Sequence, residues 1–242
     1  KKLKLLIINF FYFFHKFKIL KFLKKNNFNK FDIFFDVGAH HGESIKMFAE
    51  NFDISNIFSF EASPINFKYL SKNKHLFDKK FVTTNILIEN LALGSEQKNS
   101  TFKQSYESSS STFNKINIDS KYFKRKKNFF GLKDKDNFFN EIEIQLSTLD
   151  SYILRNNINK IDFLKMDVEG YEYDILLGLK NNIKMTKLIM FEHHYDNMIV
   201  KNYKFSTINS LLLNNNFKQI YKSKMPFRKV FEYIYLNNDL SK

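Results

Sequence analysis

Two glycines and an acid follow a short apolar run early in the chain, and this combination could hold a nucleotide. Asp36, Gly38 and Gly42 come directly after the β-prone residues 33–35, and a segment with helical periodicity opens at Ser44. A strand, a tight glycine turn and a helix N-terminus let the backbone approach a ligand and direct unpaired N–H groups at it. These residues therefore predict a cofactor site of the nucleotide-binding type.

The spacing of the glycines separates two kinds of cofactor. A dinucleotide turn reads G-x-G-x-x-G, whereas Gly38 and Gly42 are separated by three residues. This spacing argues against an NAD-dependent oxidoreductase. With Asp36 two residues before the first glycine, it is similar to the first motif of class I methyltransferases, which bind S-adenosylmethionine (SAM).

A second acid lies where a ribose could be held. Residues 57–60 have the character of a buried strand and end at Glu61. An acid at the end of the second strand of a βαβ unit can accept hydrogen bonds from both ribose hydroxyls. Ser63 and Pro64 then favour the start of a helix, because these residue types suit the N-cap and first helical positions.

The composition bounds the class of protein. The chain has 242 residues, of which 43% are hydrophobic, with 30 Phe and no Trp. This fits one α/β domain, or one domain with an appendage, around a core rich in phenylalanine. There is no cysteine, which excludes disulfides and cysteine metal sites and is compatible with a reducing, cytoplasmic location.

The leading segment is basic. Residues 1–30 contain nine lysines and no acid, so they supply most of the net charge of +14. Residues 1–27 have the pattern of an amphipathic helix, but the apolar run over 5–14 is too short to span a bilayer. No signal-peptide cleavage pattern follows it. Two interpretations stay open: peripheral contact with an anionic membrane surface, or packing on the chain's own sheet or on a second copy.

The rest of the chain alternates between strand and helix patterns. We expect strands within 33–36, 57–60, 81–89, 141–146, 161–167, 187–191, 217–221 and 230–236. The order predicts an α/β fold, namely a mostly parallel, doubly wound sheet of about seven strands that ends in an antiparallel hairpin. Polar residues stand at five predicted strand ends, where such sheets place their sites: Asp36, Glu61, Asn90, Asp167 and the run 192–194.

Residues 105–140 interrupt this alternation. A serine run at 108–111 precedes a basic and aromatic segment at 121–127. The stretch is polar and irregular, so we expect a long loop or a lid. The basic segment could bind a polyanion, which keeps an RNA methyltransferase as an alternative, but a solvated loop is the more common outcome. We therefore expect no nucleic-acid partner.

Three stretches together resemble the FkbM-type methyltransferase family. They run from Asp36 to Gly42, from Phe60 to Phe67 and from Leu164 to Glu172, and the likeness extends over about 33–194. The resemblance implies a Rossmann-like class I methyltransferase that uses SAM to O-methylate sugars or natural products. Together with the charge distribution, it predicts a basic arm over 1–30 and a methyltransferase domain over 31–242. The chain departs from the family at His40, where the family usually has Asn, and at Ala62, where it usually has Pro.

Position in the fold and the resemblance together suggest roles for individual residues. Gly38, Ala39 and Gly42 are expected at the amino-acid end of the cofactor, with Asp36 orienting the turn. Glu61 is expected at the ribose and Asn90 at the adenine. The full predicted cofactor set is Asp36, Gly38, Ala39, His40, Gly42, Ser44, Glu61, Ala62 and Asn90.

Methyl transfer needs an acceptor positioned in line with the donor and benefits from a base that takes the acceptor's proton. Asp167 is expected where donor and acceptor meet. His193 and His194 are both candidate bases, one of which would point inward while the other faces solvent, and we assign the role to His193. Glu169 and Glu172 suit the N-terminus of the following helix through the helix dipole. Asp167, Glu192 and His193 could instead bind Mg²⁺ or Mn²⁺, although nothing in the sequence requires a metal. A membrane-associated binding module without catalysis is a further alternative.

Overall fold

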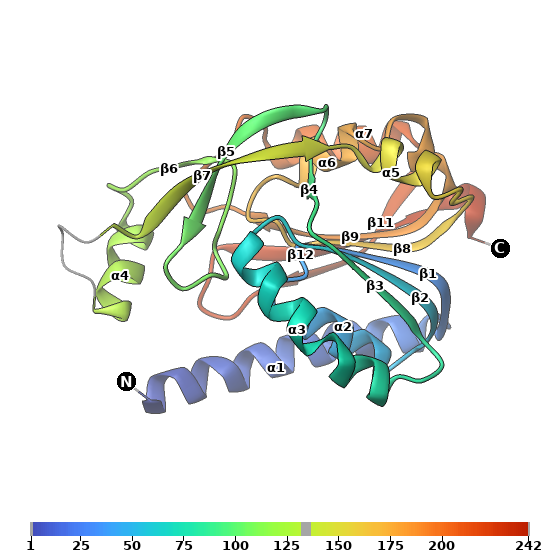
Figure 1. The fold of residues 1–242 in the computed structure, drawn as a ribbon, viewed down its shortest axis with the longest axis horizontal. Coiled ribbons are helices and arrows are strands. Elements are labelled where there is room, and N and C mark those ends of the chain that lie inside the picture. Colours follow the sequence, from blue (N-terminus) through green and yellow to red (C-terminus); the bar gives the residue numbers. More distant parts are fainter. Residues whose placement is uncertain (1, 132–136, 242) are drawn as a thin grey trace.

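The computed structural model describes residues 2–131 and 137–241, with side chains from Phe14 onward. Its centre is a seven-stranded sheet (Figure 1). Across the sheet the strands are β11 (Phe217–Lys224), β12 (Val230–Asn237), β9 (Thr186–His194), β8 (Ile161–Met166), β1 (Lys30–Val37), β2 (Asp53–Phe60) and β3 (Asn85–Glu89). The strands from β9 to β3 are parallel, whereas β12 is antiparallel to β9 and β11. The predicted fold class, including the C-terminal antiparallel hairpin, is confirmed.

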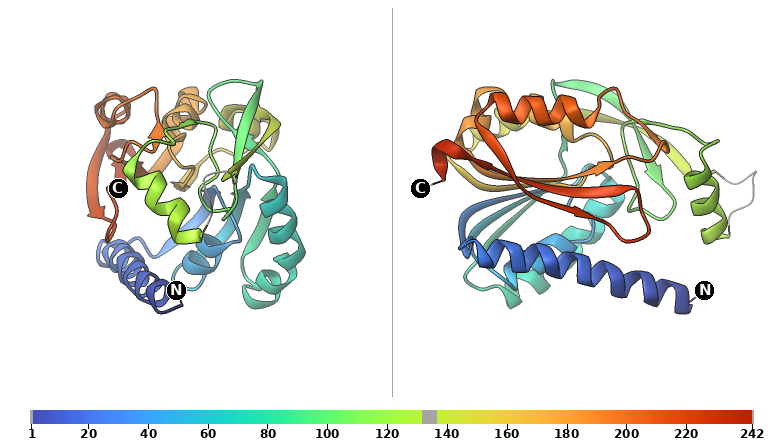
Figure 2. Two further views of the ribbon diagram at one scale, coloured as in Figure 1. Left: turned by 90° about the vertical axis from the view of Figure 1, so that its left-hand side faces the viewer. Right: turned by 180° about the vertical axis from the view of Figure 1, so that it is seen from behind.

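Helices cover both faces of the sheet, as Figure 2 shows from two sides. One face carries α1 (Lys2–Lys25), α2 (Glu43–Ala49) and α3 (Pro64–Lys80). The other face carries α5 (Leu149–Arg155), α6 (Glu172–Leu177) and α7 (Phe205–Asn214). Two 3-10 turns, η1 (Lys180–Met185) and η2 (Asn238–Leu240), follow α6 and β12.

Alternation along the strands divides the apolar side chains between two cores, because successive residues of a strand face opposite sides of the sheet. Phe34 packs on Phe48 of α2, with ring centroids 4.9 Å apart. Its neighbour Phe35 faces the opposite core, where Phe60 meets Tyr152 of α5 at 4.8 Å. The phenylalanine-rich core expected from the composition lies in these two layers.

The second half of α1 is part of the body of the protein. Ile19 and Leu23 are fully buried against the sheet, and His15 pairs with Glu232 of β12 at 2.8 Å. The first half extends beyond the carboxyl edge of the sheet (Figures 1 and 2). The packing interpretation therefore holds for residues 15–23. None of the helices among the described residues combines the length and the apolar character that a membrane span requires.

The segment expected to be a long loop or lid contains regular structure. The segment is flanked by β5 (Lys98–Ser105) and β7 (Phe139–Ser147), which pair with each other, and β7 also pairs with β4 (Ala92–Leu93). Within the segment, β6 (Lys115–Ile116) pairs with β10 (Ile199–Val200). Between β6 and β7 lies the helix α4 (Lys121–Phe130).

The expectation of a loop was wrong for α4. In its sequence, the many basic residues obscure the apolar side chains that lie on one face of the helix. Ser120 caps the helix by accepting a hydrogen bond from the N–H of Phe123, and Gly131 ends it in the left-handed region at φ 76°. Phe123 is buried against Phe138 and Met198. These contacts lie far apart in sequence, so the local pattern of charges does not reveal them.

Candidate active site

A pocket opens at the carboxyl ends of β1, β2 and β8. Its empty space, which includes its open mouth, is about 570 Å³. Residues at and just after these strand ends, four of them polar, form one part of its lining: Gly38, His40, Glu61, Ala62, Asp167 and Glu169. Apolar residues form another: Leu91, Leu93, Phe102, Phe113, Tyr171 and Ile175. This combination suits a ligand with a flat apolar part and several hydroxyl or charged groups.

The glycine turn at the end of β1 depends on glycine for a steric reason. Gly38 has φ 80°, and its N–H donates to the carbonyl oxygen of Phe60 at 3.0 Å. A Cβ at this position would lie 2.0 Å from the carbonyl oxygen of Asp167. A side chain here would therefore force β1 away from β8 and alter the floor of the pocket.

A buried ion pair holds the ends of β1 and β8 together. Asp36 and Lys165 face each other across the two strands, and the Nζ of Lys165 lies 2.9 Å from Oδ1 of Asp36. The same Nζ lies 3.4 Å from the carbonyl oxygen of Gly38 and 3.9 Å from Oδ2 of Asp167. Asp36 is fully buried and lies outside the pocket lining. It acts on the pocket through the turn.

The pKa values of this pair follow from burial and from the neighbouring charges. Burial raises the pKa of Asp36, although the positive charge of Lys165 acts to lower it. Burial alone would lower the pKa of Lys165, but Asp36 and Asp167 raise it above its ordinary value. Sequence reasoning did not single out Lys165. A lone lysine within the apolar run 161–166 was the available signal.

Glu61 lies in the pocket wall and is already partly satisfied by the backbone. Its Oε2 accepts the N–H of His40 at 2.7 Å, and its Oε1 accepts the N–H of Ser63 at 2.8 Å. Burial raises the pKa of Glu61. A carboxylate oxygen accepts two hydrogen bonds, so each oxygen keeps the capacity to bind a ribose hydroxyl.

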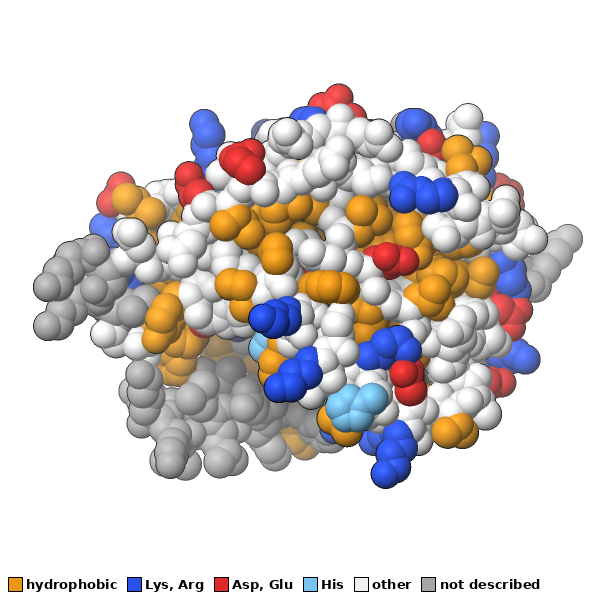
Figure 3. Space-filling view, in the orientation of Figure 1, with side chains coloured by type: hydrophobic (Ala, Val, Ile, Leu, Met, Phe, Trp, Pro, Cys, Tyr) orange, Lys and Arg blue, Asp and Glu red, His pale blue; other side chains and the backbone are white. Residues whose placement is uncertain are grey.

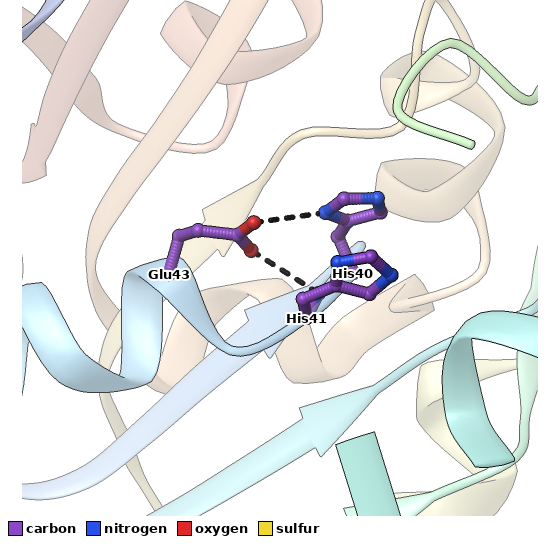
Figure 4. A group of neighbouring side chains, drawn as sticks. All are labelled: His40, His41 and Glu43. Carbon is purple, nitrogen blue, oxygen red and sulfur yellow. Dashed lines mark hydrogen bonds and ion pairs between the residues drawn. The ribbon is translucent and has the colours of Figure 1, made fainter. Parts of the chain in front are cut away.

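His40 links the glycine turn to the serine segment, residues 108–111. Its Nε2 lies 2.8 Å from the Oγ of Ser108, and its Nδ1 lies 3.0 Å from Oε1 of Glu43 (Figure 4). Burial alone would lower the pKa of His40, but Glu43 and Glu61 raise it. His40 has φ 49° and Ser108 has φ 66°, so both pocket-lining residues adopt a conformation that is costly for side chains other than glycine.

The serine segment was expected to be part of a loop and was not assigned to the site. Ser108, Ser109 and Ser111 line the pocket, and Phe113 follows them. The hydroxyl of Ser111 also accepts the N–H of Ser105 at 3.0 Å, which fixes the return of the segment toward β5. The one sequence signal for this wall was the length of the insertion.

Among the described residues, one group of three side chains could converge on a metal ion, namely His40, His41 and Glu43. The two imidazole rings are stacked at 3.8 Å with an interplanar angle of 19° (Figure 4). The nitrogen lone pairs of the two imidazoles therefore lie in nearly parallel planes. Mg²⁺ prefers oxygen ligands in an octahedron, so this group does not fit Mg²⁺.

His193 lies on the other face of β9 from the acids of the site. Its ring is buried against Tyr203 and Phe205, and its Nε2 lies 3.3 Å from the Nζ of Lys201. Burial, with Lys201, lowers the pKa of His193 to about 3. The structure therefore does not bring Asp167, Glu192 and His193 together, and His193 lies outside the pocket lining.

His194 faces the side of the sheet that carries Asp167. Its Nε2 lies 3.3 Å from Oε2 of Glu169, which lines the pocket. The helix α6 has no side-chain cap hydrogen bond, so neither Glu169 nor Glu172 caps it. The Oε1 of Glu172 instead accepts the N–H of Gly170, in the turn before the helix, at 3.0 Å. Of the two acids expected at the helix start, Glu172 therefore holds the preceding turn and Glu169 lines the pocket.

Four members of the predicted cofactor set support the pocket from outside its lining, in addition to Asp36. Ala39 and Ser44 are buried, and Gly42 has φ 90° at the start of α2. The side-chain amide of Asn90 donates to the carbonyl oxygen of Glu61 at 2.8 Å. The structure brings together Gly38, His40, Glu61, Ala62 and Asp167 in one pocket, and their binding roles stay predictions.

Comparison with known families agrees with this geometry. The family model described as the methyltransferase FkbM domain matches residues 36–219. The chain belongs to the FkbM methyltransferase family. Its family is that of the FkbM methyltransferases and its fold is that of class I SAM-dependent methyltransferases, so the sequence resemblance is confirmed. A search of curated proteins found no match.

Solved structures with a similar fold include other methyltransferases. An FkbM methyltransferase from Methylobacillus flagellatus KT has a TM-score of 0.55 and 14% identity, over 85% of this chain and 43% of that chain. A magnesium protoporphyrin IX methyltransferase from Synechocystis PCC 6803, bound to S-adenosylhomocysteine (SAH), has a TM-score of 0.52 and 9% identity, over 96% and 85% of the two chains. At these identities the likeness shows the class I methyltransferase fold alone.

Proposed function

We propose that this FkbM-family chain transfers a methyl group from SAM to a hydroxyl of a sugar, a glycolipid or a related small molecule. The observation that carries the proposal is the convergence of Gly38, Glu61 and Asp167 in one pocket at the carboxyl ends of three strands. When bound, SAM supplies a methyl group on a positively charged sulfur. In this proposal Gly38 and Ala62 lie along the cofactor, Glu61 holds its ribose, and Asp167 lies beside the acceptor.

The acids around the pocket support a neutral, hydroxyl-bearing acceptor. Asp167 and Glu169 line the pocket, and Glu192 lies behind them, 5% exposed. A phosphate or carboxylate at this point would meet like charges, whereas a sugar hydroxyl can donate hydrogen bonds to these oxygens. The protein's own task is then to orient the acceptor and to accept its proton.

The test is turnover with isotopically labelled SAM and a set of acceptors, with the product read by mass spectrometry. The set contains methyl glycosides, bacterial glycolipids and transfer RNA. We expect one added methyl group on a carbohydrate hydroxyl and no labelled RNA. Labelled RNA, with a steep fall in binding as salt rises, would replace the proposal with an RNA methyltransferase. SAM binding without turnover on any acceptor would favour the binding-module alternative.

The basic helix α4 gives the RNA alternative limited support. Two of its lysines are engaged by acids, since Lys124 lies 3.3 Å from Asp119 and Lys126 lies 2.7 Å from Glu107. On the face of the molecule drawn in Figure 3, basic side chains are scattered among polar and apolar ones. Recognition of a nucleic-acid backbone relies instead on clustered positive charge.

We also propose that the outer face of α1 makes peripheral contact with an anionic membrane. Phe14 and Phe17 are 46% and 51% exposed, and the exposed Lys18 and Lys21 follow on the same face. Exposed aromatic rings beside lysines suit the headgroup region of a bilayer. Co-sedimentation with vesicles of phosphatidylglycerol and phosphatidylcholine should exceed that with phosphatidylcholine alone, and Phe17→Ser should reduce it. Equal sedimentation in both vesicles would end this part of the proposal.

A further inference from the structure

A buried histidine nitrogen beside the pocket has no hydrogen-bond partner among the described residues. His194 is 5% exposed, and its Nε2 makes no hydrogen bond. The nearest acids are Glu169, with Oε2 at 3.3 Å, and Glu192, with Oε2 at 3.9 Å. Buried polar atoms in proteins almost always have a partner. An imidazole nitrogen that lies near two acidic side chains without a hydrogen bond to either therefore points to a proton that is exchanged at this place.

The other side of the same ring is held in place. The Nδ1 of His194 lies 3.4 Å from Oδ2 of Asp196, whose Oδ1 accepts the N–H of Met198 at 3.0 Å. Lys201 donates to the carbonyl oxygen of His194. An acid that holds one ring nitrogen leaves the other free to accept a proton, as in the histidine–aspartate pairs of hydrolases. Asp196 thus directs Nε2 toward Glu169.

Glu169 connects this histidine to the pocket. Glu169 is one of the residues that line the pocket, and its backbone has φ 49°. The hydroxyl of Thr112 donates to the carbonyl oxygen of Glu169 at 2.8 Å, which helps to hold this conformation. Backbone strain of this kind concentrates at functional sites. Glu169 is the residue through which a group in the pocket can communicate with His194.

We propose that Glu169 and His194 form the proton-accepting pair of the methyl transfer, with Glu169 as the catalytic residue and His194 and Asp196 as positioning residues. This inference rests on the proposed function. The acceptor oxygen forms its bond to the methyl carbon as the carbon–sulfur bond breaks and leaves its electron pair on sulfur. The acceptor's proton passes to the carboxylate of Glu169 and then to Nε2 of His194. The imidazolium that results lies between the carboxylates of Glu169 and Asp196.

The charges that face His194 come from several elements. They are Glu169 after β8, Glu172 on α6, Glu192 on the same strand, Asp196 after β9, and Lys201 at the backbone of His194. Burial alone would lower the pKa of His194, but Glu169 and Asp196 raise it. The accepting form is the neutral imidazole, so the transfer rate should rise with pH through the pKa of His194.

The first test needs no acceptor. Nitrogen-15 spectra of the histidine rings, recorded across pH on the full chain, give the pKa of each histidine. Glu169→Gln should lower the pKa of His194 by about one pH unit, because a neighbouring anion that favours the imidazolium is lost. Asp196→Asn should also lower it. The control Glu141→Gln changes an acid with a 63% exposed side chain on β7 and should leave it unchanged. A His194 pKa that does not respond to Glu169→Gln would overturn the pairing.

The second test compares the two adjacent histidines in turnover with labelled SAM and methyl glycosides. Glu169→Gln and His194→Gln should each lower kcat by about 100-fold or more, the usual effect of losing a proton acceptor, with SAM affinity within about threefold of wild type. The rise of kcat with pH should disappear in His194→Gln. His193→Gln should lower kcat by less than about tenfold. The reverse ranking of the two histidines would overturn the inference and return the role to His193.

The two tests separate failure of this inference from failure of the proposed function. Wild-type protein that methylates no glycoside would contradict the sugar acceptor, while the spectra would still decide whether Glu169 and His194 are coupled. Folding of each variant is checked by its thermal shift with SAH, since a misfolded variant would show none. Glu169→Gln and His194→Gln remove opposite members of the pair, so agreement between them excludes a local packing defect.

Discussion

At the scale of single residues, the carboxyl edge of the sheet is unusual for the number of ionisable groups it buries. Asp36, Lys165, Glu192 and His194 are each at most 5% exposed. A buried charge is costly unless it is paired or neutralised. The ion pair of Asp36 with Lys165 represents the first solution, and the raised pKa of Glu192 represents the second. The ion pair and the protonated Glu192 each lead to a prediction about the free energy of unfolding.

Lys165→Met should destabilise the protein strongly. The substitution leaves the carboxylate of Asp36 buried without its cation, and breaking a buried ion pair costs about 3–5 kcal/mol of unfolding free energy. The double variant Asp36→Leu, Lys165→Met removes both charges and should recover most of that loss. Urea denaturation followed by circular dichroism measures both values. A double variant no more stable than the single one would show that the pair does not act as we describe.

Glu192→Gln should stabilise the protein at high pH. Burial raises the pKa of Glu192 well above its ordinary 4.5, and Asp167 and Glu232 add to the effect. Above pH 4.5 the folded protein therefore keeps a proton that the unfolded chain has released. The stabilising contribution of protonated Glu192 is fully present below that pH and falls as the pH rises toward its pKa in the folded protein. A glutamine is neutral throughout, so its advantage should appear at pH 8 and shrink at pH 4.5.

The measurement for Glu192→Gln is thermal unfolding at the two pH values. Glu141→Gln, on an exposed position of β7, is the matched control, because exposed carboxylates have little effect on stability. A variant with a lower melting temperature than wild type at pH 8 and a higher one at pH 4.5 would have the sign opposite to that expected from burial.

At the scale of elements, α1 joins a buried half to an extended one, and the two should respond differently to substitution. Leu23 is fully buried, so Leu23→Ala should cost about 2–5 kcal/mol of unfolding free energy. Phe17 is 51% exposed, and Phe17→Ser should change stability by less than about 0.5 kcal/mol. Guanidinium denaturation tests both, and a larger loss for Phe17→Ser would mean that this face of the helix is covered.

The elements of the main sheet could be predicted from sequence because each carries a local signal. The strand that ends at Asp36 is apolar and is followed by glycines, and the helix that starts at Pro64 has a serine cap. The helix α4 also has a serine cap at Ser120 and a terminal glycine at Gly131, but its basic residues alone favour a solvated loop, because the residues that cover its apolar face, Phe138 and Met198, lie outside it. Periodicity within the element could not show which face those partners would cover.

The candidate site divides in the same way. Gly38, Glu61 and Asp167 could be found because strand ends converge in a doubly wound sheet. The choice between His193 and His194 could not be made, because it depends on which residue of β9 is in register with β12 and hence on which face each lies. A shift of one residue would exchange the two faces. Only the three-dimensional pairing decides this.

At the scale of the whole molecule, a cofactor that binds only the folded state should stabilise the entire domain. The pocket joins the ends of β1, β2 and β8 with the serine segment, so unfolding of any of these parts would lose the ligand. At a ligand concentration of about 100 times Kd, the expected gain is about 2.7 kcal/mol. For a domain of this size that corresponds to a rise in melting temperature of about 5–10 °C.

Differential scanning calorimetry with SAH and with NAD at the same concentration tests this coupling and the choice of cofactor together. SAH should raise the melting temperature and NAD should leave it unchanged, because the glycine spacing around Gly38 does not suit a pyrophosphate. Glu61→Gln should reduce the rise with SAH, since one carboxylate oxygen is replaced by an amide that cannot accept a ribose hydroxyl. A shift with NAD alone would contradict the assignment of the pocket. If Glu61→Gln showed the full SAH shift instead, the ribose would bind elsewhere in the pocket. The role of Glu61 would then be to accept the backbone N–H groups of His40 and Ser63.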